Sequence, residues 1–170
     1  MVKKTAGKVV KSAKKSYDEM SRKERKVAIA RDVIANLNAL KIKRNSGYVV
    51  GGMDYDIESL LSFGVTPQQI SQKLKKECTL CARGAMMLCK VDKFNHFNFE
   101  GVDNLGDIDN NNTTDALQDA FTDYELDNIE EAFEGYWSDV DDDNDRLRAI
   151  MQNIIDHKGD FKPEVEYTVS

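Results

Sequence analysis

Apolar residues recur at helical intervals along most of the chain. The clearest run begins after Ser21, which stands three residues before Glu24 and so matches a capping box, in which each residue binds the backbone N–H of the other. The apolar positions that follow are spaced by three, four and seven residues, as one face of a helix requires. They are Val27, Ala30, Val33, Ile34, Leu37 and Leu40. The pattern predicts a helix over about residues 22–41.

Further stretches carry the spacing and the end signals of helices. Thr66 is a cap directly before Pro67, which favours a first helical turn, and Thr122 with Glu125 repeats the capping box. The predicted helices are a short one ending near Phe63, one from Pro67 through Leu74, one from Cys78 to Phe94, a short one around Ala116 to Phe121, one through Leu126, Ile129, Phe133 and Trp137, and one from Leu147 through Ile155. We expect the helix from Cys78 to Phe94 to be central, because its small side chains include Gly84 and few charges interrupt it.

The remaining segments predict loops and a little β structure. Residues 95–113 are rich in Asn, Asp and Gly and predict a loop. Residues 47–51 are aromatic and β-branched between glycines, and residues 161–169 alternate apolar with polar positions, so we predict that these two segments pair as a two-stranded β element. The fold class is therefore mainly α: a single-domain bundle of five to six helices over residues 21–170, preceded by a basic arm, flexible or weakly helical, over residues 1–20.

Charge divides the chain into two parts. The net charge is -6, yet residues 1–44 hold 14 Lys and Arg against 4 Asp and Glu, whereas residues 94–170 hold 4 against 21. Such polarity can steer charged partners, or it can let the two parts attract each other within the fold. Both interpretations stay open from the sequence.

Hydropathy and cysteine content indicate a cytoplasmic protein. The sequence contains no apolar run approaching the roughly 18 residues of a membrane span, and no apolar stretch of a signal peptide follows the early lysines. Three cysteines do not make a disulfide framework, which favours a reducing compartment.

The cysteines also raise a metal hypothesis. The alternative zinc set is Cys78, Cys81, Cys89 and His96, because a C-x2-C pair is the usual first half of a tetrahedral site. In one continuous helix, however, Cys81 and Cys89 would lie about 12 Å apart along the axis, too far for one ion. We therefore predict buried structural thiols, no metal and no cofactor.

Catalytic motifs are absent from the sequence. The Asp-rich stretches after residue 106 lack the glycine and the final glutamate of a calcium loop, and neither phosphate-binding glycine loops nor a nucleophile elbow occurs. The sequence therefore favours a binding protein over an enzyme.

Two charged surfaces are candidates for binding. The acidic part, in which aromatic residues could serve as anchors, is the predicted site for a host or phage protein. Its members are Asp123, Glu130, Glu131, Glu134, Tyr136, Trp137, Asp139, Asp141, Asp142 and Asp143. The basic arm is the predicted site for nucleic acid, since lysines neutralise phosphates. Its members are Lys3, Lys4, Lys8, Lys11, Lys14 and Lys15.

Three blocks carry a resemblance. Residues 24–34 (ERKVAIARDVI), 78–86 (CTLCARGAM) and 146–155 (RLRAIMQNII) together resemble a group of small proteins of tailed bacteriophages and prophages, to which no activity is assigned. The resemblance therefore implies no functional residue. It implies a bacterial cytoplasm as the location and, by analogy, an accessory role, because small phage proteins commonly bind and inhibit host enzymes or defence components.

These observations lead to one expectation and two alternatives. We expect a non-enzymatic accessory protein that binds a host or phage macromolecule and inhibits a host enzyme or defence component through its acidic surface. The first alternative is a protein or small enzyme that binds a nucleotide or metal near Cys78 to Cys89. The second is a nucleic-acid accessory protein that uses the basic arm.

Overall fold

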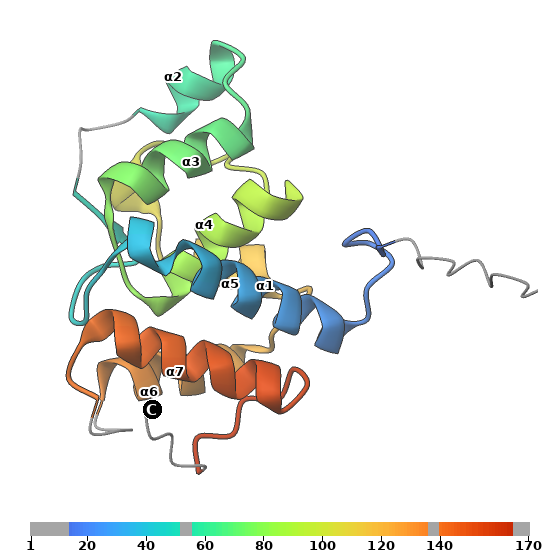
Figure 1. Cartoon of the computed structure of the whole chain (residues 1–170). Coiled ribbons are helices and arrows are strands. Elements are labelled where there is room, and N and C mark those ends of the chain that lie inside the picture. The colour runs from blue at the N-terminus through green and yellow to red at the C-terminus, as the bar shows by residue number, and fades with distance from the viewer. Residues whose placement is uncertain (1–13, 52–55, 136–139, 165–170) are drawn as a thin grey trace, which may run out of the picture.

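The structure, a computed structural model, describes residues 14–51, 56–135 and 140–164. In these residues it contains seven α-helices, three two-residue strands and two 3-10 turns (Figure 1). The helices are α1 (Arg22–Asn36), α2 (Ile57–Ser62), α3 (Pro67–Glu77), α4 (Ala82–Phe94), α5 (Asn110–Leu117), α6 (Asp123–Glu134) and α7 (Asp143–Asp156). The strands are β1 (Lys41–Ile42), β2 (Val49–Val50) and β3 (Thr79–Leu80). The predicted mainly helical class is confirmed.

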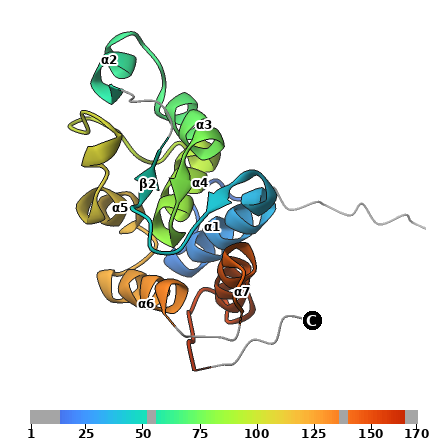
Figure 2. The ribbon, with the colours of Figure 1, turned by 90° about the vertical axis from the view of Figure 1, so that its left-hand side faces the viewer.

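Helix α4 is the centre of the core, as its sequence predicted. Every residue from Ala82 to Val91 is buried. Helices α1, α3, α5 and α6 all pack against it, and Figure 2 shows it surrounded by these elements. One hydrophobic cluster extends from Tyr17 to Ile154. The described residues therefore share a single core.

Helices α1 and α7 lie side by side against this core (Figure 1). The buried face of α1 includes Ile29, Ala30 and Val33, and that of α7 includes Leu147 and Ile150. The buried face of α7 follows the predicted apolar periodicity, and on α1 the predicted Ala30 and Val33 are buried. Val27, predicted for the same stripe of α1, is only half-buried, and Ile29, outside that stripe, is buried instead. Helix α1 ends earlier than predicted, at Asn36, because a 3-10 turn at Leu37–Ala39 leads the chain into β1.

The small sheet corrects the predicted strand pairing. Its order is β1-β3-β2, with β1 parallel and β2 antiparallel to β3. Residues 47–51 thus contribute a strand that pairs with Thr79–Leu80, and residues 161–164, the described start of the predicted tail strand, form none. Residues 165–169 lie outside the described part.

A close backbone approach accounts for this pairing. A Cβ atom added to Gly84 would lie 1.7 Å from the carbonyl oxygen of Tyr48. Because Gly84 has no side chain, the backbone just before β2 can lie against the first turn of α4. This contact holds β2 next to β3.

Two helix starts also differ from prediction. Helix α4 begins at Ala82 with Cys81 as its N-cap, because residues 79 and 80 are used in β3. Helix α5 begins at Asn110, inside the predicted loop, because Asp109 and Asn112 form a capping box there. Helix α6 ends at Glu134, and Trp137, predicted to continue its apolar stripe, lies outside the described residues.

No described helix has both the length and the apolar character that a membrane span needs.

Candidate functional site

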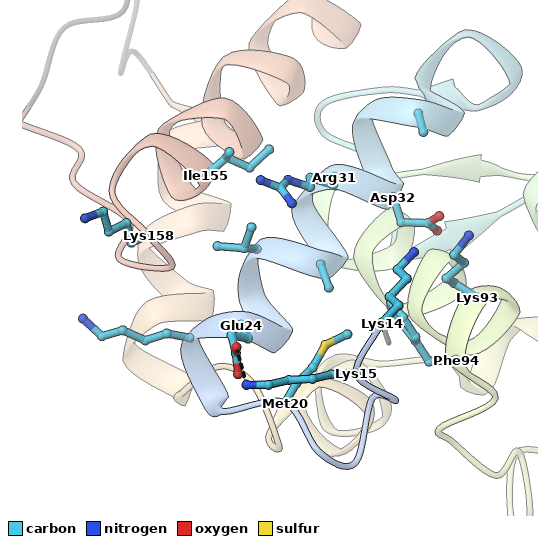
Figure 3. A pocket seen from close by; sticks show the side chains of 14 residues that line it. Lys14, Lys15, Met20, Glu24, Arg31, Asp32, Lys93, Phe94, Ile155 and Lys158 are labelled. Atoms are coloured by element: carbon cyan, nitrogen blue, oxygen red, sulfur yellow. Dashed lines mark hydrogen bonds and ion pairs between the residues drawn. The ribbon is translucent and has the colours of Figure 1, made fainter. Parts of the chain in front are cut away.

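A cleft of about 580 Å³ follows the outer face of α1 (Figure 3). We call it the α1 cleft. One side is formed by the end of α7, and the other by the end of α4 and residues 14–20. Its described lining residues are Lys14, Lys15, Met20, Lys23, Glu24, Val27, Ala28, Arg31, Asp32, Ala35, Lys93, Phe94, Ile155 and Lys158.

The floor of the cleft is apolar because of how α1 is turned. With 3.6 residues per turn, Val27, Ala28 and Ala35 share a face with Arg31, whereas Ile29 and Ala30 turn into the core. The apolar side chains of Met20, Phe94 and Ile155 extend this floor onto the walls. A ligand in the cleft would therefore meet aliphatic surface along its centre.

Positive charge surrounds this apolar floor. The described lining contains six Lys or Arg side chains and two carboxylates. Lys15 pairs with Glu24 at 2.8 Å, and Lys23 pairs with Asp160 at 2.7 Å. The other four cations form no ion pair or hydrogen bond in residues 14–51, 56–135 and 140–164. They are Lys14, Arg31, Lys93 and Lys158. The cleft therefore has a surplus of positive charge.

Its two carboxylates differ in availability. The hydrogen bond from Lys15, followed by that from the backbone N–H of Ser21, lowers the pKa of Glu24 to about 2. Glu24 is thus committed to the start of α1. Burial raises the pKa of Asp32, and its buried Oδ2 atom accepts no hydrogen bond from the described residues. Of the two carboxylates of this lining, Asp32 is therefore the one with an oxygen that has no hydrogen-bond partner among the described residues.

Tyr17 holds one wall of the cleft in place. Its ring is only 6% exposed and lies against Phe94, with ring centroids 4.5 Å apart, and against His96, at 4.8 Å. The guanidinium of Arg25 lies 5.0 Å from the centre of the same ring, and Asp18 approaches His96 Nε2 at 2.8 Å. Residues 14–20, which the sequence assigned to the basic arm, are therefore docked on the end of α4.

The lysines predicted to bind nucleic acid divide into two groups. Lys14 and Lys15 line the α1 cleft. Lys3, Lys4, Lys8 and Lys11 lie outside the described residues.

Several of the acids predicted to bind a partner are engaged within the fold. The contacts are Glu130 with Arg83 at 2.7 Å, the Asn45 N–H with Glu134 at 2.5 Å, Arg44 with Asp143 at 2.5 Å, and Asp142 as the N-cap of α7. The side chains of Asp123, Glu131 and Asp141 are exposed. Tyr136, Trp137 and Asp139 lie outside the described residues. Of these contacts, that of Arg44 with Asp143 joins the basic part of the chain to the acidic part, as does the ion pair of Lys26 with Glu125, so this polarity contributes to the fold.

The three thiols are dispersed along the core. Cys78 ends α3 and donates to the Gly51 carbonyl at 3.0 Å, Cys81 caps α4, and Cys89 lies within α4. Burial raises the pKa of Cys81 to about 11 and that of Cys89 to about 12, so both stay protonated at neutral pH.

The alternative zinc set is not assembled. In the described residues, no three His, Cys, Asp or Glu side chains are grouped closely enough to hold a metal, and His96 contacts Asp18 instead. The continuous helix between Cys81 and Cys89 supplies the physical reason, since it keeps these two thiols on separate turns.

The sequence did not reveal the α1 cleft. Arg31 on α1, Lys93 on α4 and Lys158 after α7 are far apart in the sequence, and each has the spacing of an ordinary solvent-facing residue. The sequence signal for the outer face of α1 is that Ala28 and Ala35 are apolar residues outside the predicted buried stripe. Comparisons with protein-family models, curated proteins and solved structures find no match for this chain.

Proposed function

We propose that this chain is a non-enzymatic binding protein that engages a macromolecule through the α1 cleft. The observation that carries the proposal is the combination of an apolar floor with four cations whose side chains form no ion pair or hydrogen bond in the described residues. Clefts of this size with apolar walls and a few placed polar groups are the usual form of binding sites.

The chemistry of the lining favours binding over catalysis. Its described residues include no His, Cys, Ser, Thr or Tyr, so they offer neither a hydroxyl or thiol nucleophile nor a histidine base. Glu24 is committed to Lys15 and Ser21. The described lining therefore offers no pair of available carboxylates to act as general acid and base.

We further propose that the partner is a host bacterial or phage protein. The support is the resemblance of residues 24–34, 78–86 and 146–155 to small phage proteins, by analogy with accessory proteins that inhibit host functions.

Crosslinking tests the cleft as the site of contact. A photo-reactive amino acid placed at Ala35, which lines the cleft, should give a covalent adduct with one protein in host bacterial cells. Gln72, an exposed residue of α3 outside the lining, is the matched control position. The Arg31→Glu change should suppress the adduct from Ala35. Equal adducts from both positions would contradict the proposal.

The exposed face of α6 supports a second candidate site. Tyr124 is 75% exposed and lies between Asp123 and Asp127, both exposed as well. An aromatic side chain within an acidic surface is a typical interface anchor. If α6 is the contact surface, Tyr124→Ala rather than Arg31→Glu abolishes partner binding.

A further inference from the structure

We propose that the occupant of the α1 cleft is an amphipathic helix of a partner protein, with an apolar stripe flanked on both sides by acidic residues. This inference rests on the proposed function and specifies the partner's chemistry.

The length of the cleft fits a short helix. Its floor follows α1 from Glu24 to Ala35, a distance of roughly 16 Å at 1.5 Å per residue. Three turns of a second helix span this distance. Recognition helices that lie in grooves use apolar anchors at spacings of three, four and seven residues over about this length.

The floor allows two helix backbones to approach closely. Ala28 and Ala35 are seven residues apart, so they lie two turns apart on the same face of α1, with Val27 beside them. Side chains this small leave room for apolar anchors of a second helix above and below Arg31, which stands between them on the same face. Met20 and Phe94 on one wall and Ile155 on the other then cover the sides of an inserted apolar stripe.

The positions of the cations require acid on both flanks of the occupant. Lys158, just after the end of α7, lies on one side of α1, and Lys14 and Lys93 lie on the other (Figure 3). Arg31 stands on α1 itself. An apolar stripe with Glu or Asp on each side places its carboxylates near these cations and its aliphatic side chains on the floor. This arrangement satisfies both features of the cleft.

Other ligand classes match only half of the cleft. A nucleic acid would supply phosphates, but its bases would find one aromatic side chain, Phe94, in the described lining, and its backbone would lie on aliphatic surface. An anionic membrane surface is flat and cannot reach the floor of a concave cleft. A basic helix would meet like charges.

Selection from an unbiased peptide library tests the proposed occupant. The probe is a display library of random 14-residue peptides, selected on the full-length protein. We expect the enriched peptides to share apolar residues at helical spacing with Glu or Asp on both flanks. Their dissociation constants should rise tenfold or more in Arg31→Glu, and in Ala28→Trp, which fills the floor. Lys76→Glu reverses the charge of an exposed residue of α3 outside the lining, and it should change the dissociation constants by less than twofold.

Each contrary outcome has a defined meaning. Circular dichroism of the variants excludes loss of folding as the cause of lost binding. Enriched peptides that lack acid or helical spacing, or that bind Arg31→Glu as well as the original chain, overturn the acidic helix. Binding of a 20-nucleotide single strand or of phosphatidylglycerol vesicles that depends on Arg31, without peptide enrichment, also overturns it but leaves the cleft as a binding site. Absence of both Arg31-dependent binding and the crosslink at Ala35 refutes the proposed function as well.

Discussion

At the scale of single residues, Asp32 is an acidic side chain in a cleft whose other charges are mainly positive. Its half-buried carboxylate lies in a cleft with excess cations, yet burial raises its pKa and its Oδ2 atom has no hydrogen-bond donor among the described residues. A raised pKa in the folded state means that ionisation costs stability as the pH rises through the folded pKa.

Asp32→Asn should therefore stabilise the protein at neutral pH. We expect an increase of up to about 1 kcal/mol in the free energy of unfolding, modest because the carboxylate is only half-buried. Urea unfolding at pH 7 and at pH 4 measures it, and the gain should shrink at the lower pH, where Asp32 becomes protonated. The same change should tighten binding of an acidic peptide. A gain that grows toward low pH would contradict the assignment.

Gly84 is constrained by space rather than by backbone conformation. In the interior of a helix, Gly→Ala ordinarily adds about 1 kcal/mol of stability. Here the new Cβ atom would lie 1.7 Å from the Tyr48 carbonyl oxygen, so α4 and the chain before β2 must separate. We expect Gly84→Ala to lower the free energy of unfolding by about 3 kcal/mol or more, measured in urea. Gly106→Ala, whose nearest neighbour is an Asn104 side-chain oxygen at 3.1 Å, should cost much less.

At the scale of elements, the docking of residues 14–20 determines whether the cleft has both walls. Tyr17 is the buried anchor of this segment, against Phe94 and His96. Tyr17→Ala should cost roughly 3 kcal/mol of stability, as for other buried aromatic residues. It should also speed hydrogen exchange in residues 14–21 more than in α7. Tyr17→Phe keeps the ring and should retain most of the protection; equal loss in both variants would disprove the role of ring packing.

The stability that the capping contacts at the start of α1 contribute depends on pH. The pKa of Glu24 is about 2 in the folded protein, below its ordinary 4.5, because of hydrogen bonds from Lys15 and Ser21. A lowered folded pKa contributes stability above pH 4.5 that is lost as the pH falls toward 2.

Carboxyl-detected NMR titration of Glu24 measures this pKa directly. The stability difference between the original chain and Glu24→Gln should decrease over the same pH interval, because protonated Glu24 no longer accepts both bonds. An unshifted titration of Glu24 near 4.5 would show that the capping contact is weak in solution.

At the scale of the whole molecule, attraction between basic and acidic parts contributes to the fold. Lys26 on α1 pairs with Glu125 on α6, and Lys23 on α1 pairs with Asp160 after α7. Salt screens the ion pairs that are exposed to solvent, and it screens buried pairs much less. We expect 0.5 M NaCl to lower the free energy of unfolding by about 1 kcal/mol, measured by urea unfolding. The double variant Lys23→Gln with Asp160→Asn, which removes the exposed pair, should show a smaller salt dependence, and an unchanged salt dependence would place the effect elsewhere.

The local features of this fold followed from sequence because their causes lie within a few residues. The capping boxes at Ser21 and Thr122 form as predicted, since each needs only a residue three positions away. The core faces of α6 and α7 also follow the predicted apolar periodicity, because side chains at helical spacing must share a face. On α1, by contrast, the predicted Val27 lines the outer face. A mainly helical protein was therefore predictable without any knowledge of how its helices pack.

The strand pairing and the binding cleft depend on contacts between segments far apart in the chain. Val49–Val50 pairs with Thr79–Leu80 because Gly84 admits the backbone of Tyr48, a contact that no periodicity encodes. Lys14, Arg31, Lys93 and Lys158 are ordinary surface cations in one dimension, and they surround a common apolar floor only after α1, α4 and α7 have packed. Helical spacing specifies which face of a segment is buried, whereas the packing of whole helices specifies which exposed residues meet.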